Sequence, residues 1–185
     1  MTREYKSVLI ATLILILFGA FIFVQYRAFI MPYPLSAIIF GVVAIQFSYW
    51  NRKLKGYAIS LAIAGVFSIL STPFLWETFI SVDLFASLQE TIIIDVIRFL
   101  FALSITTWIV FCSFQLKEQF PKIILFLSAG IFLILYLTNY TEFLIGCYAL
   151  MFIPSQITEG KPKILAPALL LFLFEALDWI TYLVN

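Results

Sequence analysis

Seven stretches of mostly apolar residues follow one another along the chain, and they decide what it can fold into. A helix needs about 20 such residues to cross a bilayer. Because only short polar connections separate the stretches, the sequence predicts an all-α, polytopic membrane helix bundle. We expect one transmembrane domain over residues 1–185 with about seven transmembrane helices. The predicted spans are residues 7–26, 34–50, 57–80, 90–114, 121–138, 141–157 and 164–184.

The bulk composition supports a bilayer environment and excludes several classes of protein. Hydrophobic residues make up 64% of the chain and charged residues 11%, whereas soluble domains average about 45–50% and about 25%. A net charge of +1 provides no basic field for nucleic acid. The chain contains no histidine, the commonest general base and metal ligand. We therefore expect the lipid bilayer as a partner, no nucleic acid, no metal and no cofactor.

Two of the spans have a structural alternative, and the first does not. The apolar run over residues 8–24 is longer than the apolar part of a signal peptide, about 7–15 residues, and lacks a small-residue cleavage site. We expect it to be retained as a helix. The fifth and sixth spans are short, so a re-entrant hairpin over residues 121–157 is the alternative to two full crossings.

Positively charged residues alternate between the two sides of the predicted bundle. Nine of the eleven Lys and Arg residues lie before the first span or in the connections after the second, fourth and sixth spans. Basic residues near span ends stay on the cytoplasmic side. We therefore expect a multi-pass protein of the cell membrane with a cytoplasmic N-terminus and an external C-terminus. The nine residues are Arg3, Lys6, Arg52, Lys53, Lys55, Lys117, Lys122, Lys161 and Lys163.

Four ionisable residues lie within the spans and form the candidate ion, proton or substrate site. Asp95 and Arg98 lie in the fourth span, and Glu175 and Asp178 lie in the seventh. Each pair has the i, i+3 spacing that places both side chains on one helix face. At the rise of an α-helix, the four residues lie about 7 to 13 Å from the outer ends of their spans. They therefore share a layer in the outer half of the bilayer.

The cost of these charges predicts how the two spans meet. A charge at the bilayer centre costs about 2.5–3.5 kcal/mol on insertion scales. We therefore expect the fourth and seventh helices to pack together, with Arg98 forked onto Asp178 or Glu175 and supported by Asp95. Three carboxyl groups then face one guanidinium, so Glu175, the deepest acid, is expected to be protonated or to hold a cation. The alternative is an ion pair that only packs helices.

Small and polar residues predict further helix contacts. Small residues four positions apart on the second and third spans favour a close helix approach, and the polar Gln46 needs a partner on another helix. Before the fourth span, Ser87 and Glu90 have the spacing of a capping box. Pro73 predicts a kink in the third span. The small residues are Ala37 and Gly41 on the second span, and Ser60, Ala64 and Ser68 on the third.

Three functions are compatible with this sequence. The first is binding or transport of a small solute or cation through the layer of Asp95, Arg98, Glu175 and Asp178. The second is a membrane-embedded enzyme acting on a lipid or isoprenoid, which is disfavoured because no nucleophile motif accompanies the carboxyl groups. The third is a non-catalytic subunit whose partner is another membrane protein. We assign no catalytic, cofactor-binding or metal-binding residues.

The charge pattern generates a test of topology. Reporter proteins fused next to Arg3 and after Asn185 should report opposite sides of the membrane, with the Arg3 fusion in the cytoplasm, because the basic residues favour that side. If both fusions report the same side, the number of crossings is even, and the seven-span prediction is wrong.

Overall fold

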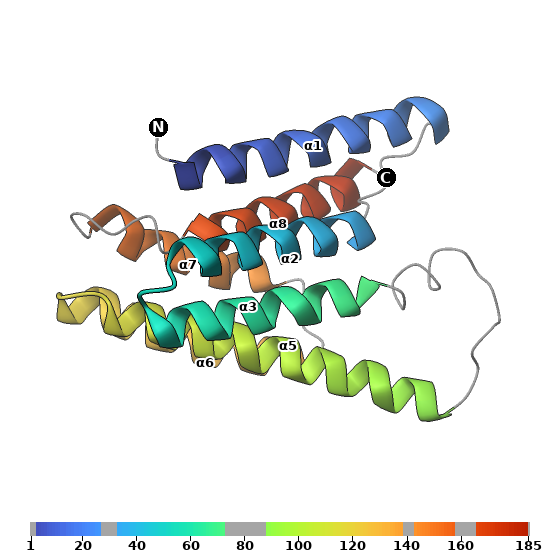
Figure 1. Ribbon diagram of the computed structural model, residues 1–185. Helices are drawn as coiled ribbons and strands as arrows, with labels where there is room; N and C mark the ends of the chain where they lie inside the picture. The colour runs from blue at the N-terminus through green and yellow to red at the C-terminus, as the bar shows by residue number, and fades with distance from the viewer. Residues whose placement is uncertain (1–2, 27–32, 73–87, 139–142, 158–165, 185) are drawn as a thin grey trace.

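Every regular element in the described part of the chain is an α-helix, as the sequence predicts. The computed structural model describes residues 3–26, 33–72, 88–138, 143–157 and 166–184. Figure 1 shows the helices lying roughly side by side along one direction. They are α1 (Arg3–Tyr26), α2 (Tyr33–Trp50), α3 (Lys55–Leu70), α5 (Leu88–Phe114), α6 (Gln119–Leu137), α7 (Leu144–Ile157) and α8 (Ala166–Val184).

The helix ends agree with the predicted spans to within four residues, except at the end of the third span. Helix α3 ends at Leu70, where the N–H of Ser71 donates to the carbonyl oxygen of Phe67 at 3.0 Å. The rest of that predicted span, with the kink at Pro73, lies outside the described residues, as does Ser87 of the predicted capping box.

Length and apolar character single out two helical segments as able to cross a membrane. These are Asp95–Phe114 in α5 and Gln119–Leu137 in α6. The apolar segments described in α1, α2, α3 and α8 are shorter. Helix α7 has 14 residues and is about 21 Å long, which is less than the bilayer core of about 30 Å.

The helices pack in a closed ring. Each of α2, α3, α5, α6, α7 and α8 packs against the next along the chain, and α8 returns to contact α2. Helix α1 lies against both α2 and α8, as Figure 1 shows. Helices α5 and α8 do not form one of these closely packed pairs, contrary to the sequence-based expectation. The order of the ring therefore follows the order of the chain.

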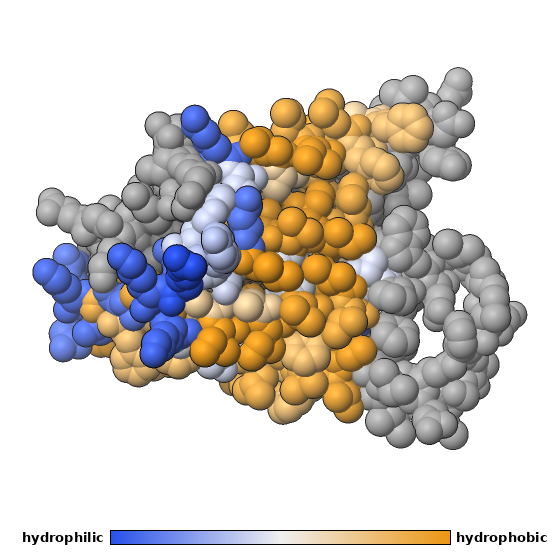
Figure 2. Space-filling model, in the orientation of Figure 1, coloured by the Kyte–Doolittle hydropathy of each residue, from blue (hydrophilic) through white to orange (hydrophobic). Residues whose placement is uncertain are grey.

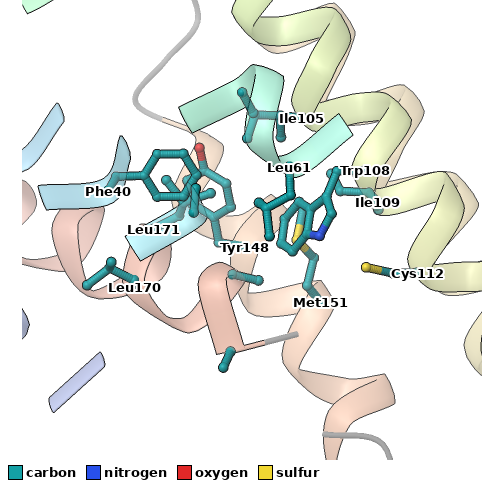
Figure 3. Close-up of a cluster of buried hydrophobic side chains, with 14 of the residues drawn as sticks. Phe40, Leu61, Ile105, Trp108, Ile109, Cys112, Tyr148, Met151, Leu170 and Leu171 are labelled. Carbon is teal, nitrogen blue, oxygen red and sulfur yellow. The ribbon is translucent and has the colours of Figure 1, made fainter. Parts of the chain in front are cut away.

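Apolar side chains fill the centre of this ring. Figure 3 shows Phe40 of α2, Leu61 of α3, Trp108 of α5, Met151 of α7 and Leu171 of α8 converging on one cluster. The exposed fraction of each of these side chains is at most 8%. The described helices thus enclose a packed apolar core.

Helices α2 and α3 approach each other closely, as the small residues of both spans predicted, although the contact also uses Gly65, which was not among those residues. A Cβ atom added to Gly65 would lie 2.7 Å from the carbonyl oxygen of Gly41. Beside this contact, the hydroxyl of Ser68 donates to the carbonyl oxygen of Ala37 at 2.8 Å. Such close backbone approach is available only where side chains are very small.

The predicted partner for Gln46 is also present. The Oε1 atom of Gln46 on α2 accepts a hydrogen bond of 2.7 Å from the Ser7 hydroxyl on α1. This bond joins α1 to the ring.

The Gly41–Gly65 contact generates a test of the packing. We expect Gly65→Ala to lower the free energy of unfolding by about 1–3 kcal/mol, the usual cost of overpacking a core, because the new methyl group would meet backbone atoms of α2. The matched control is Gly130→Ala on α6, where a Cβ atom would meet nothing within 4 Å. Melting temperatures in detergent should fall for Gly65→Ala alone. Equal melting temperatures would contradict this packing of α2 and α3.

Candidate functional site

The predicted charged residues of α5 lie towards one end of the bundle. Asp95 and Arg98 belong to the first half of α5, and the α2–α3 and α5–α6 connections lie at the other end (Figure 1). Both side chains are exposed. Within the part of the chain that the structure describes, neither of them forms an ion pair. The outward position of these two residues differs from the buried pair that the sequence predicts.

Glu175 lies on α8 and is half-buried. Its helix α8 is not among the closely packed neighbours of α5, which carries the predicted partner Arg98. The side chain of Asp178, the fourth predicted site residue, lies outside what the structure describes. In the order of the ring, α6 and α7 stand between the helices that carry the two charges.

Tyrosines on the intervening helices α6 and α7 lie near these charges. Arg98 and Glu175 both act electrostatically on the hydroxyl of Tyr136 on α6. Glu175 also acts on Tyr148 of α7, and so does Tyr136. The guanidinium of Arg98 thus acts on Tyr136, whereas the carboxyl group of Glu175 acts on both phenols. Neither tyrosine was predicted as a site residue from the sequence, although both lie within predicted spans and each carries a polar hydroxyl group.

Aromatic contacts fix the position of these phenols. The ring of Tyr136 stacks on Phe132 at a centroid distance of 5.7 Å and lies 5.8 Å from Phe101 of α5. The ring of Tyr148 lies 6.0 Å from Phe132. Aromatic pairs of this kind contribute about 0.5–1.5 kcal/mol beyond their buried area. The tyrosine hydroxyls are therefore carried on rings that α5, α6 and α7 hold together.

This arrangement defines what the site can do. A phenol can both donate and accept a hydrogen bond, and aromatic faces attract cations. The cluster formed by Arg98, Tyr136, Tyr148 and Glu175, which we call the outer polar cluster, can therefore hold a small polar group or a cation beside Glu175. Among the described residues, no three His, Cys, Asp or Glu side chains form a group that could hold a metal ion.

A second polar group lies deeper in the bundle. Trp108 is fully buried beside Tyr57, with ring centroids 6.3 Å apart. Within the described structure its indole Nε1 has no hydrogen-bond acceptor. A buried donor without a partner costs about 1–3 kcal/mol. Figure 3 shows this indole among apolar side chains, between Leu61 and Met151.

Comparisons with protein-family models, with curated proteins and with solved structures gave no match to this chain. Function must therefore be argued from the residues themselves.

The outer polar cluster generates a test of its own geometry. We expect Tyr136→Phe and Glu175→Gln to show a coupling energy of about 0.5–3 kcal/mol in a double-mutant cycle, as interacting residues do. The Tyr136→Phe ring can keep its contacts with Phe101 and Phe132, so the fold should survive. Free energies of unfolding in detergent provide the measurement.

The control pair is Tyr136→Phe with Glu118→Gln. Glu118 is exposed and precedes α6 at the other end of that helix. Effects of distant residues add to within about 0.5 kcal/mol. Additive effects in the Tyr136 and Glu175 cycle would contradict the electrostatic link between the two residues.

Proposed function

We propose that this chain is a multi-pass protein of the cytoplasmic membrane that binds or transports a small solute or cation at its outer polar cluster. The membrane part of the proposal rests on the outer surface of the bundle, and the binding part rests on Glu175.

The outer surface of the bundle carries many large apolar side chains. Leu9, Leu13 and Leu17 on α1 have exposed fractions of 55–61%, and Ile134 on α6 is 63% exposed. On the face shown in Figure 2, hydrophobic residues form a broad belt next to an end that is rich in hydrophilic residues. Soluble monomers rarely expose contiguous apolar patches larger than about 300–600 Å². A bilayer around this belt would remove its contact with water.

The basic residues support one orientation in the membrane. Arg52, Lys53 and Lys55 lie in or next to the α2–α3 turn, and Lys117 and Lys122 lie around the α5–α6 turn. These two turns and the N-terminus share one end of the bundle in Figure 1. Because basic residues favour the cytoplasm, this end is proposed to be cytoplasmic and the outer polar cluster to be near the external face.

The observation that carries the binding proposal is the position of Glu175. Its carboxyl group is half-buried on α8 and acts on two tyrosines of neighbouring helices. Ionisable residues inside a membrane bundle are costly, and they commonly mark ion and substrate sites. Arg98 acts on one of them, Tyr136, from α5, and Asp95 and Asp178 supply further acids on α5 and α8. A cation beside Glu175 would offset the negative charge of this layer.

A flux measurement tests this function. Purified wild type reconstituted in liposomes should take up protons or monovalent cations, detected with an enclosed dye. Glu175→Gln removes the negative charge and keeps the shape of the side chain, so it should abolish the flux. For binding without transport, added cations should raise the melting temperature of the wild type and leave that of Glu175→Gln unchanged.

The matched control is Glu118→Gln, which removes an exposed carboxyl group far from the outer polar cluster and should behave as the wild type. A wild type without flux and without cation-dependent melting would contradict the proposal. So would equal responses from the wild type and Glu175→Gln.

One observation favours a second candidate function, that of a non-catalytic subunit. Gly130 on α6 and Gly146 on α7 are exposed, and a Cβ atom added to either would meet nothing within 4 Å. Small residues on an outer face permit another transmembrane helix to approach closely. Gly130→Leu should then disrupt co-purification of a membrane partner without lowering the melting temperature of the isolated chain.

A further inference from the structure

Two basic segments of the chain come together at the end of the bundle proposed to be cytoplasmic. Helices α3 and α5 pack against each other. At the start of α3, the backbone at Gly56 lies so close to the Phe111 ring of α5 that no Cβ atom would fit between them. This contact places Lys55, next to Gly56, near the end of α5 and the turn that carries Lys117.

The charge of this surface is strongly positive. Arg52, Lys53, Lys55 and Lys117 are exposed, and the acid Glu118 is the neighbour of Lys117. We call the surface formed by Arg52, Lys53, Lys55, Lys117 and Lys122 the basic rim. The guanidinium of Arg52 lies 5.5 Å from the centroid of the exposed Tyr49 ring. The rim therefore combines mobile ammonium groups with one guanidinium held over an aromatic ring.

Exposed aromatic rings lie directly beside the basic rim. Tyr49, Phe114 and Phe120 have exposed fractions of 63–67%. The Phe114 ring packs edge-on against Phe126, with centroids 5.7 Å apart. Further along α6, its exposed face continues with Ile123 and other apolar side chains. A ligand that contacts this surface thus meets cations first, then aromatic rings, and then an apolar helix face.

We propose that the basic rim is a binding surface for anionic phospholipid headgroups of the cytoplasmic leaflet. The groups of a phospholipid follow the same order as these surface groups. Its phosphate can contact Lys and Arg while its acyl chains lie along the apolar face of α6. Single-stranded nucleic acid could stack its bases on the aromatic rings, but it would leave the apolar face of α6 in water. This inference rests on the membrane part of the proposed function and adds a preference for one class of lipid.

Reconstitution in nanodiscs of defined lipid composition tests the inference. The wild type should melt at a higher temperature in discs of phosphatidylcholine with phosphatidylglycerol than in discs of phosphatidylcholine alone. The difference should shrink as salt is raised, because exposed charges are screened. Each basic residue removed from the rim, as in Lys53→Ala and Lys117→Ala, should lower the affinity for phosphatidylglycerol about fivefold, which corresponds to about 1 kcal/mol.

Two variants serve as controls. Lys6→Ala removes a charge of the same sign from α1, which packs against α2 and α8 and not beside α5, so its effect should be smaller than that of Lys53→Ala. Glu118→Gln removes the acid next to the rim and should strengthen the preference for phosphatidylglycerol. Inorganic phosphate added to neutral discs should not reproduce the effect of the lipid.

The outcomes separate this inference from the membrane proposal. If the wild type inserts into both kinds of disc and melts at the same temperature in each, the lipid preference is wrong and the membrane proposal stands. If Lys6→Ala and Lys53→Ala lower the affinity for phosphatidylglycerol equally, the lipid responds to the overall charge and not to the basic rim. That result would overturn the inference. A wild type that stays monomeric in buffer without detergent and enters neither disc overturns both.

Discussion

The close contact of α2 with α3 sets the geometry on which the rest of the ring depends. When the outside of a bundle is as apolar as its core, apolar side chains alone do not decide which helix face turns inward. Small residues and hydroxyl groups make that decision here. Gly41 and Gly65 bring two backbones together, and Ser68 adds a hydrogen bond across the same contact. Helix α3 then presents Gly56 to α5, which places the turns at the proposed cytoplasmic end side by side.

The same ring order explains why a tyrosine on an intervening helix lies near both charged residues. Helices α5 and α8 carry the charges, and each packs against its chain neighbours. A direct ion pair would require α5 and α8 to be adjacent. Tyr136 of α6 instead lies within the electrostatic influence of both Arg98 and Glu175. A neutral phenol between opposite charges costs less to bury than either ion, so this arrangement keeps the polar layer without a fully buried ion pair.

Local sequence patterns predicted most of the helices of the fold but only some residues of the candidate site. Apolar run length predicted the all-helical character and nearly every helix end, because a helix satisfies its own backbone groups. Residue size predicted a close helix approach by α2 and α3 but not the part played by Gly65. The polarity of Gln46 predicted a partner on another helix but did not identify it as Ser7. Which helices surround the charged layer could not be predicted, since ring order depends on the packing of whole faces. Tyr136 was missed for a related reason: a tyrosine on an apolar helix is ordinary until its neighbours are known.

The packed centre of the ring limits how the proposed function can work. Between the outer polar cluster and the basic rim, Phe40, Leu61, Trp108 and Met151 fill the interior. A cation beside Glu175 would have to cross these side chains and then approach several Lys and Arg residues of like charge. Both steps oppose an open pore in this conformation. Binding at Glu175 requires neither step, whereas transport requires the helices around Trp108 to separate. The indole Nε1 of Trp108, which has no acceptor within the described structure, would then be able to donate a hydrogen bond to water that accompanies the cation.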